Sequence, residues 1–206
     1  MWLLPSLGRP ERAQRVAEAA RDTKITLRLH KGDPRLKDYL RIEWPSKWKV
    51  VVGPRLSLTE TLNEAFRENP RERQYGFLAD DTIPSPSDWS QRLQTVAGRD
   101  FVAYPDDGLH GEKLCTHFLI GGDLMRSVGF WCLPGLKHNF LDTVWYVMGS
   151  KLGVLRYVPE VKFEHLHPLA GKAEQDETYK IGQGWYEKDK KVFERWVTES
   201  GTPGDN

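Results

Sequence analysis

The stretch Tyr75-Gly76-Phe77-Leu78-Ala79-Asp80-Asp81 decides how this sequence is interpreted. Five uncharged, mostly apolar residues followed by a turn signal predict a short buried strand that delivers two adjacent carboxylates at its end. Adjacent like charges repel, so a fold that holds them together usually supplies a cation. Hard divalent cations such as Mg²⁺ and Mn²⁺ bind carboxylate oxygens together with substrate phosphates. The pair therefore indicates a metal site, or an Asp pair that accepts backbone hydrogen bonds in the next turn.

Apolar runs and helical periodicities alternate on the N-terminal side of this stretch. The pattern predicts strands over 3–5, 24–30 and 49–52, and helices after Pro10 and over 58–66, the latter capped by Ser57 or Thr59. Alternating strands and helices predict an α/β fold with a mostly parallel twisted sheet flanked by helices. One domain over residues 1–200 is expected from the length.

The C-terminal side has a similar mixture of elements. We expect a Pro/Ser loop over 82–86, strands over 101–104, 117–120, 154–158 and 161–165, helices over 89–96, 124–128, 142–152 and 177–198, and a frayed tail over 201–206. Ligands of such sheets lie beyond the carboxyl ends of the strands. This rule directs attention to the segments 5–9, 30–33, 53–55 and 80–81.

Two histidines form a second signal, in Glu164-His165-Leu166-His167-Pro168. In an extended segment, residues two apart share a face, so His165 or His167 can complete a metal shell begun by Asp81. The alternative is a structural histidine. A zinc site made from this pair alone lacks a third ligand of evident spacing.

Two further segments carry candidate polar residues. Asp142 begins a predicted helix, where it is either an N-cap or a general base that deprotonates an acceptor hydroxyl. In Asp176-Glu177-Thr178-Tyr179-Lys180, the last two side chains either close over a diphosphate or belong to the first turn of the last helix.

Composition narrows the class of protein. Residues 1–75 hold 16 Lys and Arg against 10 Asp and Glu, and the remainder holds 14 against 19. The basic half suits a phosphate-bearing ligand or a nucleic acid, or consists of solvated helix faces. The cysteines Cys115 and Cys132 lack CxxC spacing, which argues against a zinc knuckle or a disulfide framework and for a reducing cytoplasm. No apolar run approaches the ~20 residues of a membrane span.

These pieces occur in an order that resembles the GT-A type of nucleotide-sugar glycosyltransferase, especially its family-2-like, short phage-type members. The segment 5–10 looks like the first strand-loop-helix, so the resemblance implies that Pro5, Ser6 and Arg9 contact the nucleobase. Asp33 matches the Asp that reads uracil and ribose. Ala79-Asp80-Asp81 looks like the DXD metal motif with Ala79 in place of its first Asp. Asp81 is then the metal ligand, and Asp80 contacts the ribose or a metal-bound water.

The resemblance extends into the second half of the chain. Leu141-Asp142 is similar to the segment that carries the catalytic base of inverting members, although Leu141 breaks the acidic pair often found there. The stretch from Glu164 to Tyr179 resembles the histidine and tail region of the short phage-type enzymes. It implies that His165 or His167 binds the metal and that Lys172, Tyr179 or Lys180 contacts the diphosphate.

The implied function is a metal-dependent, inverting glycosyltransferase that uses Mn²⁺ or Mg²⁺ and a nucleoside-diphosphate sugar, with UDP as the expected nucleotide. Short phage-type relatives imply hydroxymethylated pyrimidines in DNA as the acceptor, in a host cytoplasm; a glycan or a protein is the alternative. A nucleotidyltransferase is a rival interpretation, although Ser6-Leu7-Gly8-Arg9-Pro10 contains one glycine where a Gly-rich phosphate loop is expected. A non-enzymatic nucleic-acid or carbohydrate binding module is another.

Overall fold

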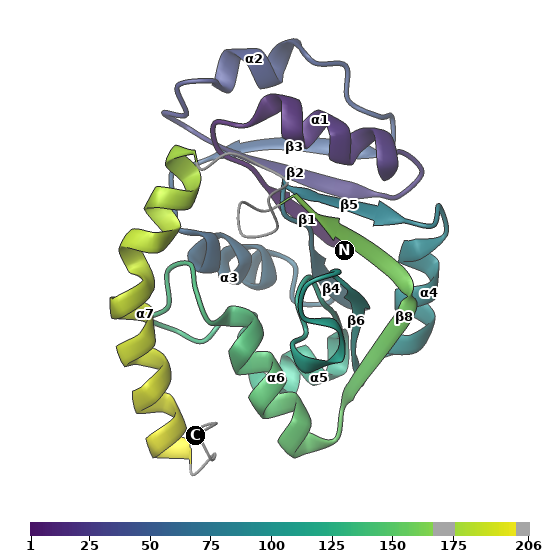
Figure 1. Cartoon of the computed structure of the whole chain (residues 1–206). Helices are drawn as coiled ribbons and strands as arrows, with labels where there is room; N and C mark the ends of the chain where they lie inside the picture. Colours follow the sequence, from purple (N-terminus) through teal and green to yellow (C-terminus); the bar gives the residue numbers. More distant parts are fainter. Residues whose placement is uncertain (167–175, 201–206) are drawn as a thin grey trace.

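A mixed eight-stranded sheet forms the centre of the computed structural model, which describes residues 1–166 and 176–200 (Figure 1). Its strands are β1 (Trp2–Pro5), β2 (Ile25–His30), β3 (Trp48–Gly53), β4 (Gln74–Phe77), β5 (Thr82–Ser85), β6 (Val102–Asp106), β7 (Leu119–Gly121) and β8 (Leu155–His165). They lie in the order β3-β2-β1-β4-β7-β6-β8-β5.

Most strands of the sheet point the same way. β1 pairs in parallel with β2 and β4, β2 pairs in parallel with β3, and β6 pairs in parallel with β8. β7 is antiparallel to both β4 and β6, so β6 and β8 share the direction of β1 to β4. Only β7 and β5 among the described strands run oppositely. The predicted α/β fold with a mostly parallel sheet is therefore confirmed, and most strands bring their carboxyl ends to one edge.

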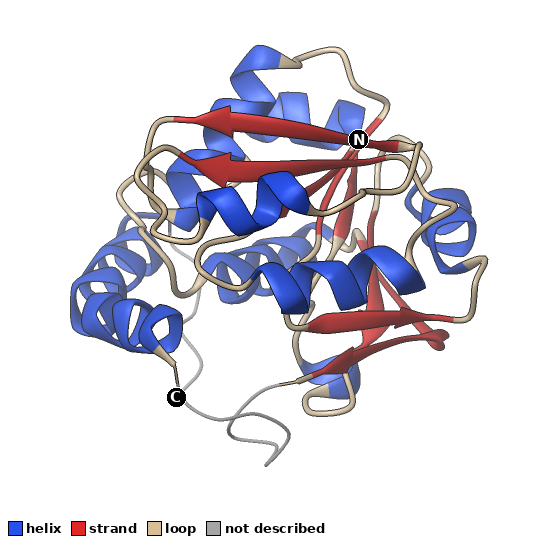
Figure 2. Cartoon of the chain, turned by 90° about the horizontal axis from the view of Figure 1, so that it is seen from above, coloured by secondary structure: helices blue, strands red, loops and turns tan. Residues whose placement is uncertain are grey.

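Helices cover both faces of the sheet (Figure 2). α1 (Pro10–Ala19) and α4 (Trp89–Ala97) pack with Trp2 and Leu4 in one apolar cluster. α3 (Leu58–Glu68), α5 (Gly122–Val128) and α6 (Leu141–Leu152) pack with Leu3 in the other. Successive side chains of a strand point to opposite faces, which is why neighbours in β1 belong to different clusters.

The last helix, α7 (Glu177–Ser200), runs along one side of the molecule (Figure 1). Its Val192, Phe193 and Trp196 pack on Leu136 and Val144. Among the described helices, none has the length and apolar character that a membrane crossing requires.

Local sequence signals account for several boundaries. Ser57 caps α3 in a capping box with Glu60, as one of the two predicted caps. Pro10 starts α1, where a missing backbone N–H costs nothing. In β4, a Cβ on Gly76 would collide with Trp2 and Leu119, so glycine is required for these strands to pack closely.

Several predicted elements differ in the structure. The segment expected to be a Pro/Ser loop forms β5, because Thr82 to Ser85 pair antiparallel with the end of β8. The two strands expected over 154–158 and 161–165 are one strand, β8. The short helix α2 (Leu36–Arg41) and the 3-10 turn η1 (Gly111–Lys113) were not predicted. The predicted frayed tail over 201–206 lies outside the described residues.

Candidate active site

A cavity of about 600 Å³ opens at the carboxyl edge of the sheet. It is lined by segments that follow β1, β2, β3, β4 and β6, by the end of β8 and by the first turns of α7. All four segments that the strand-end rule singled out contribute to it: the loop after β1, the Asp pair after β4, His30 at the end of β2 and Arg55 after β3. The cavity is therefore where the topology predicts a ligand.

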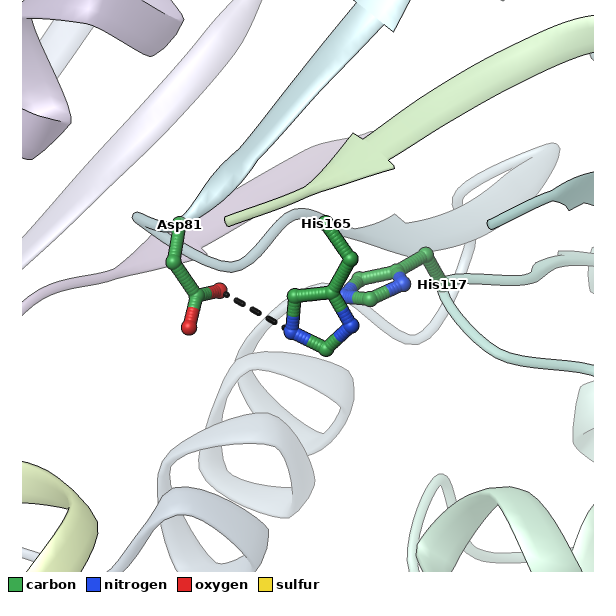
Figure 3. Close-up of side chains that lie close together, drawn as sticks. All are labelled: Asp81, His117 and His165. Carbon is green, nitrogen blue, oxygen red and sulfur yellow. Dashed lines mark ion pairs between the residues drawn. The ribbon is translucent and has the colours of Figure 1, made fainter. Parts of the chain in front are cut away.

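One carboxylate and two imidazoles converge on the cavity wall. Asp81 follows β4, His165 ends β8, and His117 precedes β7, so three distant segments of the chain supply them (Figure 3). One potential ligand atom from each side chain lies within 4.8 Å of the others. Asp81 Oδ1 lies 3.5 Å from His165 Nε2. A separation of this size is compatible with a shared metal ion.

Two of these side chains carry buried polar atoms that lack a hydrogen-bond partner among the described residues. They are Oδ1 of Asp81 and Nδ1 of His117. Burial, and then the nearby His165, lower the pKa of His117 to about 3, so its imidazole is neutral and able to donate a lone pair. Buried polar groups are nearly always satisfied, so these two atoms are available to a bound ion.

Asp80 occupies a different environment from its neighbour. Its Oδ2 accepts a hydrogen bond from Ser6 Oγ at 2.7 Å, and its Oδ1 pairs with Arg9 Nη1 at 3.0 Å. Ser6 Oγ in turn lies 2.6 Å from the hydroxyl of Tyr39. These contacts join the loop after β1 to the strand end of β4, across the point where the strand order reverses.

The pKa values of the two adjacent carboxyl groups are shifted in opposite directions. Burial, together with the charge of Asp81, raises the pKa of Asp80 although Arg9 opposes the shift. Burial acts in the same sense on Asp81, but the imidazole of His165 and the hydroxyl of Tyr179 outweigh it and lower the pKa of that carboxyl. The lowered pKa keeps Asp81 ionised, as a metal ligand must be.

The first turn of α7 closes one side of the cavity. The hydroxyl of Tyr179 donates to Asp81 Oδ2 at 2.7 Å and accepts from Arg12 Nη1 at 2.9 Å. Asp176 accepts two hydrogen bonds from the Arg9 guanidinium, which also lies 4.1 Å from the centre of the Tyr179 ring. Arg9 thereby ties the loop after β1 to the start of α7 at the site.

Asp142 also lies on the cavity wall, in the first turn of α6. Its Oδ1 accepts the backbone N–H of Thr143 at 2.8 Å, and burial raises the pKa of its carboxyl. The N-cap interpretation is wrong, because the N-cap of α6 is Phe140 and no side chain caps this helix; Asp142 lies inside the first turn, where the helix dipole favours a carboxylate. It faces the same cavity as Asp81, as the other interpretation requires.

The remaining predicted binding residues divide into three groups. Pro5, Ser6, Arg9, Asp80 and Tyr179 line the cavity. Two others point elsewhere: Asp33 accepts the backbone N–H groups of Gly8 and Arg35 and does not line the cavity, and exposed Lys180 pairs with Glu177. His167 and Lys172 lie outside the described residues.

His117 was missed by sequence reasoning. It precedes a short antiparallel strand, whose carboxyl end is at the opposite edge, so the strand-end rule passes over it. Its backbone has φ of +50°, a left-handed conformation that is unusual for a residue with a side chain. A lone His between Thr116 and Phe118 gives no spacing signal that would have marked it.

Neither a family model nor a curated protein sequence matches this chain. Several solved structures share its fold. S. aureus TarS 1-349 matches with 9% identity and a TM-score of 0.57, over 79% of this chain and 58% of that chain. Mth528, a nucleotidyl transferase from Methanothermobacter thermautotroptrophicus, matches with 14% identity and a TM-score of 0.52, over 82% of this chain and 88% of that chain.

A third structure, Rv0371C from Mycobacterium tuberculosis H37Rv, was solved in complex with manganese. It matches with 14% identity, a TM-score of 0.53 and coverage of 77% of this chain and 86% of that chain. Identities this low establish the fold and leave the activity open. The chain has the Rossmann-like fold of nucleotide-diphospho-sugar transferases, a group in which nucleotidyltransferases also occur.

Proposed function

We propose that this chain is a metal-dependent transferase that moves a sugar from a nucleoside-diphosphate sugar, with UDP as the nucleotide, to an acceptor hydroxyl. The observation that carries the proposal is the cluster of Asp81, His117 and His165 on the wall of the strand-end cavity. A fold that binds nucleotide sugars and a possible metal cluster in the expected cleft support the same conclusion.

The donor set favours Mn²⁺ over Mg²⁺. One carboxylate with two imidazoles suits a transition metal, whereas Mg²⁺ prefers oxygen ligands. When bound by Asp81, His117 and His165, such an ion would neutralise the charge that develops on the leaving diphosphate. The Tyr179 hydroxyl holds Asp81 Oδ2, which leaves Oδ1 directed at His165.

Cationic side chains are placed to bind the donor's phosphates. Arg9 and Arg55 line the cavity, and Arg55 makes no ion pair within the described part of the chain. Arg9 is paired with Asp80 and Asp176 through three of its five N–H groups, so a donor phosphate shares the guanidinium with these carboxylates. Of the predicted diphosphate contacts, Tyr179 lines the cavity, Lys180 does not line it and pairs with Glu177, and Lys172 lies outside the described residues.

The acceptor's proton needs a base in the same cavity. Asp142 is the base that the sequence predicts, and its position on the cavity wall supports that role without establishing it. We propose a hydroxymethylated pyrimidine in DNA as the acceptor, with a glycan or a protein as the alternative. An affinity for DNA that falls steeply with salt supports the first class, and an affinity that does not respond to salt contradicts it.

Nucleotidyl transfer is a second candidate, because Mth528, a nucleotidyl transferase, has the same fold over most of both chains. The two activities release different products. We expect the protein to release UDP from a UDP-sugar in the presence of Mn²⁺ and to release no pyrophosphate from nucleoside triphosphates with a sugar phosphate. Pyrophosphate release without UDP release would replace the proposed function with the second one.

A further inference from the structure

A second carboxylate–imidazole pair faces the same cavity, outside the metal cluster. Asp107 and His110 lie in the segment that follows β6, at the carboxyl edge of the sheet. His110 Nδ1 lies 2.7 Å from Asp107 Oδ2. His110 lines the cavity together with Asp81 and Asp142. Neither residue of the pair belongs to the Asp81, His117 and His165 cluster.

Asp107 is held rigidly and stays ionised. Its side chain is 1% exposed, and its Oδ1 accepts the backbone N–H groups of Leu109 and His110 at 2.9 and 2.8 Å. Burial alone would raise the pKa of this carboxyl, but the hydrogen bonds from His110 and the backbone outweigh it and lower the pKa below its ordinary value. An ionised carboxylate can only accept, so Nδ1 of His110 carries the proton.

The tautomer fixes what His110 can do. With the proton on Nδ1, Nε2 has a free lone pair, and the half-exposed imidazole (48% exposed) can present it to a ligand. The segment is anchored a second time, because the hydroxyl of Tyr104 donates to the carbonyl of Glu112 at 3.0 Å. An imidazole oriented by a buried carboxylate on a fixed loop is the arrangement of a general base.

The other described histidines have different surroundings. His30 Nδ1 lies 3.2 Å from the Pro54 carbonyl, and the ring of His138 packs against Gly182. His117 and His165 belong to the possible metal cluster. Among the described histidines that line the cavity, His110 is therefore the one whose ring is oriented by a carboxylate that does not belong to the metal cluster.

We infer that His110, oriented by Asp107, is the base that accepts the acceptor's proton in the proposed transfer reaction, in place of Asp142. The inference rests on the proposed function. The acceptor O–H bond breaks and its proton moves to His110 Nε2. The freed electron pair forms the new bond to the anomeric carbon, and the diphosphate leaves with the electron pair of the broken C–O bond. Asp107 keeps its charge and stabilises the imidazolium.

Asp142 then has the structural role that its contacts describe. Its Oδ1 accepts the N–H of Thr143 within the first turn of α6, where a carboxylate is favoured by the helix dipole. This contact accounts for Asp142 without chemistry. The Asp107–His110 pair also closes the turn after β6, and it differs from the Asp142 contact because it fixes the orientation of an imidazole that lines the cavity.

The test uses water as the acceptor and measures UDP release from a panel of UDP-sugars with Mn²⁺. We expect His110→Gln to lower turnover by at least ~100-fold, the scale of general base catalysis. The dissociation constant for UDP with Mn²⁺, measured by calorimetry, stays unchanged because His110 binds neither. Glu112→Gln, at an exposed position two residues along the same segment, is the matched control and keeps the wild-type rate.

Two further variants separate proton transfer from folding. In Asp107→Asn, the amide N–H₂ faces Nδ1 and selects the opposite tautomer, so turnover falls while UDP binding and the thermal midpoint are kept. In His110→Ala, added imidazole restores part of the lost rate, because the half-exposed position admits it. A merely structural role predicts no such rescue.

Three results overturn the inference. Wild-type turnover in His110→Gln shows that His110 is not the base. If Asp142→Asn loses turnover in the same assay, Asp142 is the base. Loss of UDP binding in His110→Gln makes the residue a binding group. No rescue of His110→Ala by imidazole removes the proton-transfer role. If the wild-type protein neither binds UDP with Mn²⁺ nor releases UDP from any UDP-sugar, the proposed function fails as well. Measurements on the wild-type protein alone therefore distinguish failure of the proposed function from failure of the inference about His110.

Discussion

At the scale of single residues, the site depends on how buried polar atoms are satisfied. Asp81 Oδ1 and His117 Nδ1 are buried without a hydrogen-bond partner in the described structure, and Asp81 keeps its charge while Asp80 next to it is shifted the other way. The assignment of a metal ligand among two adjacent carboxylates therefore follows from their surroundings. The sequence-based expectation selected the same residue from its resemblance to a metal motif.

Removing either type of ligand should remove metal binding. We expect Asp81→Asn and His117→Ala each to weaken Mn²⁺ binding by at least ~10-fold, because each deletes one of three donors. Electron paramagnetic resonance of free Mn²⁺ in a titration measures this loss. Asp88→Asn, an exposed carboxylate paired with Arg92, is the control and leaves Mn²⁺ binding unchanged. Undiminished affinity in both ligand variants would contradict the cluster.

What could be predicted at this scale depended on strand ends. Asp81 follows β4, where the rule for parallel sheets looks, and His165 was predicted from its spacing to a second histidine and lies at the end of β8. His117 precedes the antiparallel β7, and an imidazole there is visible only once the fold brings three distant segments together. Asp33 also follows a strand, yet its oxygens are used by the backbone of the Gly8 and Arg35 segments. Position alone does not tell which way a side chain turns.

At the scale of elements, α7 fixes one wall of the cavity through a buried charge. Asp189, which is 1% exposed, accepts the backbone N–H groups of Lys137, His138 and Asn139 at 2.8 to 2.9 Å. These residues precede α6 and contribute Lys137 and His138 to the cavity lining. A long-range contact of this kind has no periodicity in the sequence, so the helix could be predicted and its anchoring could not.

Removing this anchor should destabilise the fold. In Asp189→Ala, three buried N–H groups lose their acceptor, and we expect the free energy of unfolding to fall by about 2–4 kcal/mol. Urea unfolding followed by circular dichroism should show a lower midpoint at an unchanged slope. Glu187→Ala, exposed on the same helix, should leave the midpoint in place. Equal midpoints for the two variants would show that α7 is not held in this way.

Elements with their own periodicity were predicted well, and elements that depend on partners were not. α1, α3 and α4 were expected from apolar spacing and caps, and all three form. β5 was expected to be a loop because Pro84 and Pro86 interrupt it, yet it pairs with β8 at the edge of the sheet, where strand prolines are tolerated. Tertiary pairing thus overrode local propensity.

At the scale of the whole molecule, the fold brings the loop after β1 and the start of α7 to one cavity. Arg9, in the loop after β1, binds Asp80 after β4 and Asp176 before α7. The cavity therefore forms only when the sheet and the last helix are both in place. The basic charge of residues 1–75 contributes Arg9 and Arg55 to this cavity, which is consistent with a ligand that carries phosphates.

The central claim is that a divalent ion and a nucleoside diphosphate bind this cavity together. Calorimetric titration of UDP into the protein, with Mn²⁺ and then with EDTA, tests it most directly. The account predicts binding with Mn²⁺ that EDTA abolishes and that Asp81→Asn weakens at least ~10-fold, since the ion joins the carboxylate to the phosphates. UDP binding of equal strength with Mn²⁺ and EDTA, or no binding under either condition, would contradict it.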